Sequence, residues 1–215
     1  MCARCRRGRA AGRGNLARNR PAGRGNSRSA TAVRGPAGRA KTTYNPAMGE
    51  EIISIVNAAD QVVGTAARAE LRRPRQPPGL IYRVNYILLF NRVGWILAQR
   101  RAAAKDLYPG RIDLAAGGVL CAGEDYAPSA ARELAEELGV SPPLIAHFDL
   151  WFEDAQQTPT RRNWGRVFSA IHDGPFELQK SEVASAEFMP VGDALALPAA
   201  QVTPDTRQAL VGYLM

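Results

Sequence analysis

The segment that decides the fold is residues 118–140, GVLCAGEDYAPSAARELAEELGV. Residues 127–138 are rich in alanine, leucine and glutamate, which favour a helix, and Gly139 is placed to end it. Leu134 and Leu138 stand four residues apart, so they lie on the same side of this helix. We therefore expect a helix that is anchored to a hydrophobic core through these two leucines.

The other side of this helix is acidic. Glu133, Glu136 and Glu137 stand at positions i, i+3 and i+4, so they share one face. Three carboxylates within one turn repel one another, and a hard divalent cation relieves the repulsion because Mg²⁺ and Mn²⁺ prefer oxygen ligands. On an isolated helix the same residues form an ordinary solvated acidic face, so their spacing alone leaves both interpretations open.

The complete pattern of the segment is more specific than its acidic face. It follows G-x5-E-x7-R-E-apolar-x-E-E-x-G-apolar. The fixed or class-restricted positions are Gly118, Glu124, Arg132, Glu133, Leu134, Glu136, Glu137, Gly139 and Val140. This pattern is the signature of the Nudix hydrolases, and the chain resembles that family. Residues 118–140 are therefore called the Nudix box.

The resemblance extends beyond the box. From about residue 50 to residue 190 the chain is similar to the Nudix subgroup related to isopentenyl-diphosphate isomerases. The residues that carry this similarity are Val56-Asn57, Val63-Gly64, Arg68-x-Glu70, Leu89-Phe90-Asn91, Gln99-Arg100-Arg101, Lys105-Asp106-x-x-Pro109-Gly110 and Asp113-x-x-x-Gly117-Gly118. The resemblance implies an α/β (α+β) fold, an α/β/α sandwich around a mixed sheet, in which divalent metal bridges the substrate diphosphate to the box.

The resemblance also implies which residues bind the metal. Glu133 and Glu137 are the principal ligands of Mg²⁺ or Mn²⁺, and Glu136 is a further ligand, directly or through water. The Gly118 carbonyl is a candidate for an additional contact. Metal of this kind lowers the pKa of a bound water, which then attacks phosphorus.

Other residues support this chemistry in the implied mechanism. Arg132 orients the glutamates by an ion pair, Glu124 supports the loop, and Gly139 closes the helix. A base must take a proton from the attacking water, and Glu133 is one candidate. Glu182 is a second, as a base or an extra ligand, with an ordinary loop carboxylate as the alternative.

Three basic residues before the box are candidates for binding the substrate phosphates. Arg100, Arg101 and Lys105 follow one predicted strand, and the guanidinium fork of arginine suits a diphosphate. The alternative is a solvated basic edge beside an acidic box.

The rest of the chain reads as strands with interspersed helices. Expected strands cover residues 52–56, 61–64, 81–90, 95–100, 112–116, 144–152, 166–171 and 186–189. Expected helices cover residues 65–71, 127–138 and 203–214. Strands outnumber helices, which independently favours a mixed sheet with helices packed on it. The hairpin near the start of this region offers strand edges through which a homodimer could form.

The positive charge of the chain is concentrated in residues 1–47. The whole chain has 28 Lys and Arg, 20 Asp and Glu and a net charge of +8, but this segment holds 11 Arg, Lys41 and no acidic residue. From Met48 onward, 16 basic and 20 acidic residues remain. A basic, nucleic-acid-binding protein as a whole is therefore excluded.

The basic segment itself is predicted to be a disordered tail, because it has few large apolar residues and repels itself. Translation from Met48 would give a compact domain over residues 48–215. The alternatives are an accessory tail that binds nucleic acid, a targeting peptide, or a zinc half-site at Cys2-x-x-Cys5 without a matching pair.

Composition excludes other classes. No apolar run reaches the length of a membrane span, and three cysteines cannot form a disulfide scaffold. We expect a cytoplasmic protein in a reducing environment, with Cys121 as the one cysteine outside the tail.

The leading functional hypothesis is a metal-dependent hydrolase that cleaves the diphosphate linkage of a small molecule, such as a nucleoside diphosphate linked to another moiety. The first alternative is a non-catalytic Nudix-like module that binds a nucleotide, although such modules usually have an eroded box. The second is isopentenyl-diphosphate isomerase, whose expected Cys and His positions hold Ala116 and Gly118 here. Nucleoside diphosphates, dinucleotides, nucleotide sugars and isoprenoid-like diphosphates all stay open as substrates.

Overall fold

The computed structural model describes residues 51–72, 80–157 and 159–215, so the predicted tail at residues 1–47 lies outside the described residues. The strands are β1 (Ile52–Val56), β2 (Val62–Ala67), β3 (Ile81–Phe90), β4 (Ile96–Arg101), β5 (Ile112–Asp113), β6 (Ile145–Asp154), β7 (Arg161–Ile171) and β8 (Val183–Met189). The helices are α1 (Tyr126–Leu138), α2 (Val191–Ala196), α3 (Pro204–Leu214) and the 3-10 helix η3 (Arg68–Arg72).

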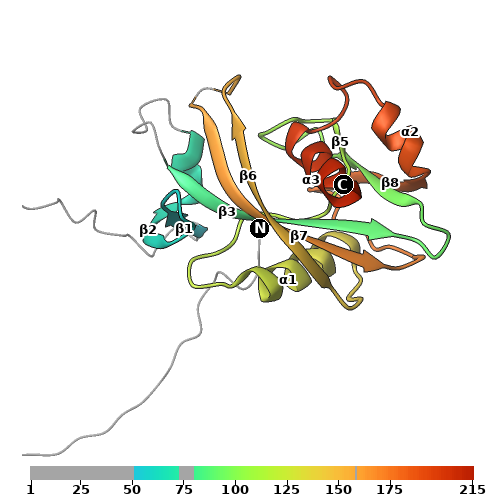
Figure 1. The fold of residues 1–215 in the computed structure, drawn as a ribbon, viewed down its shortest axis with the longest axis horizontal. Helices are drawn as coiled ribbons and strands as arrows, with labels where there is room; N and C mark the ends of the chain where they lie inside the picture. The colour runs from blue at the N-terminus through green and yellow to red at the C-terminus, as the bar shows by residue number, and fades with distance from the viewer. Residues whose placement is uncertain (1–50, 73–79, 158) are drawn as a thin grey trace, which may run out of the picture. The chain divides into compact units, whose positions relative to one another are not determined.

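The strands form one mixed sheet of eight strands, with β3 at its centre (Figure 1). The main path through the sheet is β2-β1-β3-β4-β5, with β7 also paired to β3, β6 to β7 and β8 to β4. The β3–β7 pair is parallel and runs from Ile81↔Arg162 to Phe90↔Ile171, whereas the other strand pairs are antiparallel. The expected mixed sheet is therefore confirmed.

The alternation of side chains along β3 divides the hydrophobic core in two. Successive residues of a strand point to opposite faces of the sheet. Tyr82, Val84, Tyr86 and Leu88 belong to one buried cluster, whereas Ile87 and Leu89 belong to the other. Because both faces of β3 are apolar, both need a covering layer.

The helices supply those two layers (Figure 1). On one face α1 packs through Ala130, Leu134 and Leu138, all fully buried. On the other face α2 and α3 pack through Ala194 and Ala209, among other residues. The α/β/α sandwich expected from the resemblance is confirmed, and the two leucines anchor α1 as the sequence predicts.

The segment after the first hairpin differs from its prediction. The sequence predicts a helix over residues 65–71, but β2 continues to Ala67 and only the short η3 follows. Thr65, Ala66 and Ala67 pair with β1 at Ser54, Ile53 and Ile52. Hydrogen bonding to a neighbouring strand thus overrides the local helical preference of an alanine-rich segment.

Candidate active site

The acidic face of α1 lies on a small cavity. Glu133, Glu136 and Glu137 all line this cavity, which has a volume of about 50 Å³. Their burial is graded: the Glu136 side chain is 29% exposed and that of Glu133 is 15% exposed, and Glu137 is 9% exposed. The shared face that the spacing predicts is therefore present, and it is partly buried.

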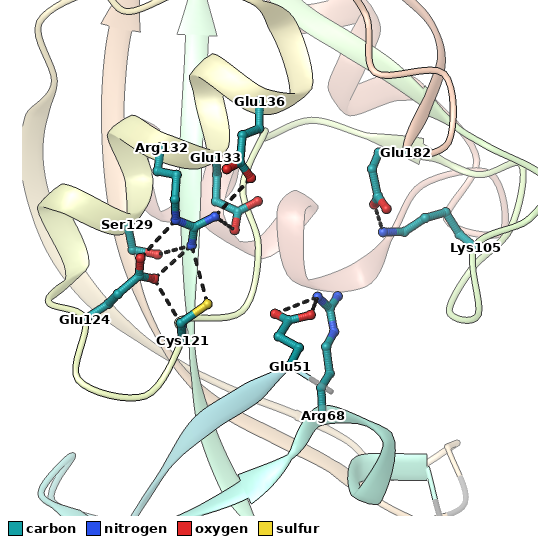
Figure 2. A network of polar contacts seen from close by, with 10 residues as sticks. All are labelled: Glu51, Arg68, Lys105, Cys121, Glu124, Ser129, Arg132, Glu133, Glu136 and Glu182. Atoms are coloured by element: carbon teal, nitrogen blue, oxygen red, sulfur yellow. Dashed lines mark hydrogen bonds and ion pairs between the residues drawn. The ribbon is translucent and has the colours of Figure 1, made fainter. Parts of the chain in front are cut away.

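Arg132 holds two of these carboxylates and joins them to the loop before the helix (Figure 2). Its Nη1 donates to Glu133 Oε1 at 2.8 Å and to Glu136 Oε2 at 3.1 Å. Its Nε and Nη2 donate to the two oxygens of Glu124 at 2.9 and 2.8 Å. Glu124 Oε2 also accepts a hydrogen bond of 3.1 Å from the backbone N–H of Cys121. Arg132 and Glu124 thus have the geometry of an orienting residue and a loop support.

These contacts set the ionisation of Arg132 and Glu124. Although burial disfavours its charge, Arg132 has a raised pKa because Glu124 and Glu133 surround it. Burial also works against the charge of Glu124, but the hydrogen bonds and charge of Arg132 hold the pKa of that carboxyl below its ordinary value. The pair stays charged and keeps the loop fixed to α1.

Glu133 and Glu137, the two most buried carboxylates of α1, lie where a negative charge is unfavourable. Burial, followed by the charge of Glu133, raises the pKa of Glu137 to about 8. Burial also raises the pKa of Glu133, although Arg132 opposes this shift. Glu137 Oε2 accepts a hydrogen bond from the Gly117 backbone N–H at 3.3 Å. That bond and the more distant Lys105 do not compensate the buried charge.

The glycines of the box allow the backbone to approach these carboxylates. A Cβ on Gly118 would lie 2.7 Å from Glu133 Oε2. Gly117 has a φ of +134°, and a Cβ there would lie 2.2 Å from the Asn85 carbonyl oxygen. The Gly118 carbonyl accepts a hydrogen bond of 2.9 Å from the Asn85 N–H. Gly139 has a φ of 70° and ends α1 by donating to the Ala135 carbonyl, as predicted.

A second group of charged residues faces the box from outside it (Figure 2). Arg68 Nη1 donates to both oxygens of Glu51, at 2.8 and 3.1 Å. Lys105 forms an ion pair with Glu182. All four residues line the cavity that the α1 glutamates line. The structure therefore brings the predicted residues Lys105 and Glu182 to the box.

The sequence alone predicts no role for Glu51 or Arg68, although Arg68 belongs to the residues that carry the family resemblance. The sequence signal that could have paired these two residues lies in the first hairpin. Ile52 pairs with Ala67, so the residues before β1 and after β2 lie opposite each other. The Arg68 N–H also donates to the Glu51 carbonyl at 2.8 Å. This register predicts the ion pair, but not its position against a helix about 65 residues later in the chain.

Of the two arginines on β4 that are predicted to bind phosphate, one faces the site and the other faces solvent. Arg101 lines a larger cavity next to the box, where its Nη1 lies 2.5 Å from Asp113 Oδ2. The side chain of Arg100 is exposed and donates to the Gly110 carbonyl at 3.0 Å. Arg100 lines neither cavity. Neighbours on a strand point to opposite faces, so only one of them can face the site.

The chemistry of the small cavity fits a hard divalent cation. Five carboxylates line it, from Glu51, Glu133, Glu136, Glu137 and Glu182, against the two basic residues Arg68 and Lys105. Such an excess of partly buried carboxylate groups suits Mg²⁺ or Mn²⁺. Across the described residues, no three His, Cys, Asp or Glu side chains already stand as a formed metal-ligand cluster. Four of the five carboxylates bond to basic side chains: Glu133 and Glu136 to Arg132, Glu51 to Arg68, and Glu182 to Lys105.

The larger cavity has a volume of about 630 Å³ and opens beside the small one. Arg68, Lys105, Gly117 and Gly118 line both cavities. The larger one extends to Arg161 on β7 and to the start of α3. A molecule with a phosphate group at the carboxylates can therefore place its remaining part in this larger space.

Comparisons with known proteins identify the family of the chain. A model of the NUDIX domain matches residues 81–210. An uncharacterized Nudix hydrolase of Pseudomonas aeruginosa is 43% identical over 175 residues, which cover 80% of this chain and 98% of that protein. An uncharacterized Nudix hydrolase of Yersinia pestis is 37% identical over 171 residues, which cover 79% of this chain and 89% of that protein.

The fold comparison gives the same result. The crystal structure of DR0079 from Deinococcus radiodurans has a TM-score of 0.63 and 25% sequence identity, and the match covers 75% of this chain and 98% of that one. The chain therefore belongs to the Nudix hydrolase family, whose members act on pyrophosphate bonds. In the described part of the chain, every helix is too short or too polar to span a bilayer.

Proposed function

We propose that the protein is a Mg²⁺- or Mn²⁺-dependent hydrolase that cleaves the diphosphate linkage of a small organic molecule. The observation that carries the proposal is that the α1 carboxylates line a small cavity, which shares Arg68 and Lys105 with a neighbouring cavity of about 630 Å³. The carboxylates supply the oxygen ligands for a cation. The two basic side chains supply the positive charge for a diphosphate at the junction.

In this proposal Glu133, Glu137 and Glu136 hold the cation, and the Gly118 carbonyl is an additional candidate ligand. When bound, the cation would neutralise phosphate charge and make water a better nucleophile. Arg132 keeps Glu133 in position through its 2.8 Å hydrogen bond. Glu133 and Glu182 are the two candidates for accepting the proton of the attacking water, because both line the small cavity.

Arg68 is proposed to bind the diphosphate together with Lys105. We expect the Arg68→Gln variant to raise KM about tenfold, because one charge-assisted hydrogen bond is worth about 1.5–3 kcal/mol. Steady-state kinetics on any diphosphate that is turned over would measure this. The exposed Arg100→Gln variant is the matched control, with an unchanged KM expected.

A second variant separates phosphate binding from a purely structural ion pair. The double variant Arg68→Gln, Glu51→Gln leaves no carboxylate without its partner. If Arg68 binds phosphate, the double variant keeps the high KM of the single one. Recovery of the wild-type KM in the double variant would instead assign Arg68 to holding Glu51.

The histidines of the chain favour hydrolysis over isomerisation. The chain has two, His147 and His172, and neither lines either cavity. His147 Nε2 lies 2.8 Å from Ser169 Oγ, and His172 Nδ1 accepts a hydrogen bond from the Gly174 N–H. Isomerase chemistry requires histidine ligands at the site, and these two residues are occupied elsewhere.

The test of this function is the formation of phosphorylated products by the full chain from a panel of diphosphates, measured by chromatography, because linkages substituted at both ends release two phosphomonoesters and no free phosphate. The panel contains nucleoside diphosphates, dinucleotides, nucleotide sugars and prenyl diphosphates, each with Mg²⁺, with Mn²⁺ and with EDTA. We expect turnover that depends on metal for at least one class. Tight binding of a nucleotide without turnover of any panel member would overturn the proposal in favour of a non-catalytic module.

A further inference from the structure

The loop between β4 and β5, residues 102–111, reaches two separate parts of the site. At one end Lys105 forms an ion pair with Glu182, and both residues line the small cavity with the α1 glutamates (Figure 2). Three positions later, Tyr108 lines the larger cavity, and its hydroxyl donates to Oδ2 of Asp154, the last residue of β6. The loop therefore joins the box to the hairpin of β6 and β7.

Tyr108 has a backbone conformation that its own sequence disfavours. Its φ is 51°, in the left-handed region that a bulky residue rarely adopts. The next residue is Pro109, which further restricts the backbone of the residue before it. Among the described residues other than glycine, only Asp60 shares a positive φ, and a short aspartate tolerates it better. Such a conformation persists only where the surrounding contacts hold it.

Tyr108 is held by contacts with the β6–β7 hairpin and with its own loop. Its ring centroid lies 5.8 Å from Arg161 Cζ and 5.1 Å from Arg111 Cζ, distances at which a cation is attracted to the aromatic face. Arg161 is itself fixed, because its Nη2 lies 2.6 Å from Asp205 Oδ2. Burial and the hydrogen bond to Asp154 raise the pKa of Tyr108, so its hydroxyl stays protonated and remains the donor. Tyr108 thus fastens the loop to two strands of the sheet.

Lys105 is the residue of this loop whose position matters for the proposed chemistry, because it lines both cavities. A lysine side chain is long and flexible, so its ammonium is placed accurately only if the backbone that carries it is fixed. On one side the Ala102 N–H donates to the Glu182 carbonyl at 2.9 Å, and the Lys105 N–H donates to the Ala102 carbonyl at 3.1 Å. On the other side the loop is fixed through Tyr108. Lys105 lies between these two points of attachment.

We propose that Tyr108 is a positioning residue, whose hydrogen bond to Asp154 keeps the loop in the conformation in which Lys105 reaches the substrate diphosphate. This inference rests on the proposed function and adds to it a residue outside the box. Without the hydrogen bond, the left-handed conformation of Tyr108 loses part of its support, the loop relaxes and the Lys105 ammonium moves away from the box. Because Tyr108 acts through Lys105, its contribution appears only when Lys105 is present.

A double-mutant cycle on the full chain tests this coupling. The ligand is inorganic pyrophosphate with Ca²⁺, an oxygen-ligated cation, because pyrophosphate has no organic part that could touch Tyr108 directly. By calorimetric titration, we expect Tyr108→Phe to weaken pyrophosphate binding about fivefold and Lys105→Met about tenfold. In the Lys105→Met background, Tyr108→Phe should have no further effect. Tyr213→Phe is the matched control, since Tyr213 lines neither cavity and stacks on Phe90.

Two substitutions of Asp154 show whether the hydrogen bond itself is responsible. Asp154→Ala removes the acceptor and should weaken pyrophosphate binding as much as Tyr108→Phe does. Asp154→Asn should restore most of the affinity, because a tyrosine hydroxyl can donate to the amide oxygen or accept from the amide nitrogen. An equal loss from Tyr108→Phe with and without Lys105 would overturn the inference, and so would unchanged affinity in the Tyr108→Phe variant.

The outcomes separate this inference from the hydrolase. Product formation from diphosphates, with no coupling between Tyr108 and Lys105, would overturn the positioning role and leave the hydrolase intact. Coupled losses of pyrophosphate binding, without turnover of any diphosphate, would support the positioning role and overturn the hydrolase. Absence of pyrophosphate binding to the wild type would remove Lys105 from diphosphate binding and overturn the positioning role.

Discussion

Replacing Glu133 by glutamine is expected to lower metal-dependent diphosphate hydrolysis by a factor of about 100 or more, the usual contribution of a positioned acid or base. The same loss is expected for Glu137→Gln. Glutamine keeps the size of each side chain but removes the negative charge that would hold the cation. Both residues line the small cavity, and a Cβ on Gly118 would lie 2.7 Å from Glu133 Oε2, so little space exists for a substitute ligand.

The control for these variants is Glu187→Gln. Glu187 is an exposed carboxylate on β8 that lines neither cavity, so its replacement removes the same charge without touching the site. Initial rates at saturating Mg²⁺ would be compared among the three variants, with circular dichroism as a check of the fold. Glu133→Gln activity within a factor of about three of that of Glu187→Gln would remove the box from the mechanism.

A parallel Glu182→Gln variant separates the two candidates for the base. Glu182 is ion-paired with Lys105, whereas Glu133 is held by Arg132. If Glu182 is the base, its variant loses as much kcat as Glu133→Gln does. If Glu182 only positions Lys105, the main effect falls on KM.

The box could be predicted because its information is local. The spacing of Glu133, Glu136 and Glu137 places them on one face through helix geometry alone, and Gly139 ends the helix at the expected residue. Arg132 is within reach of its partners for the same reason, since Glu133 is adjacent and Glu136 lies one turn away. The mixed sheet could also be predicted, because the expected strands outnumber the expected helices and the helices are interspersed among them.

The remaining part of the site depends on contacts between distant segments. Arg161 and Asp205 lie 44 positions apart and meet only because β7 and α3 reach the same cavity. In the sequence, each of these residues taken alone is typical of an ordinary charged residue in a strand or at the start of a helix. The extension of β2 to Ala67 likewise depended on its pairing with β1. Local propensity carries no information about such a partner.

The stability of the metal-free protein is expected to fall as pH rises, and Glu137→Gln should remove much of that fall. Burial and the charge of Glu133 raise the pKa of Glu137 from its ordinary 4.5 to about 8 in the folded protein. The folded state therefore binds this proton more tightly than the unfolded state does. The resulting stabilisation is complete below about pH 4.5 and is lost progressively as pH rises to about 8.

Glutamine is neutral at every pH and does not undergo this loss. The free energy of unfolding of Glu137→Gln minus that of the wild type, in EDTA, should therefore increase between pH 4.5 and 8 by an amount on the order of a few kcal/mol. Urea unfolding at several pH values would measure it, with Glu187→Gln as the variant whose difference from the wild type stays nearly constant. Addition of Mg²⁺ at pH 8 should stabilise the wild type but not Glu137→Gln, because only the charged carboxylate gains a partner. A pH-independent difference would show that Glu137 is ionised without cost in the metal-free fold, and the case for a cation as its counter-charge would fail.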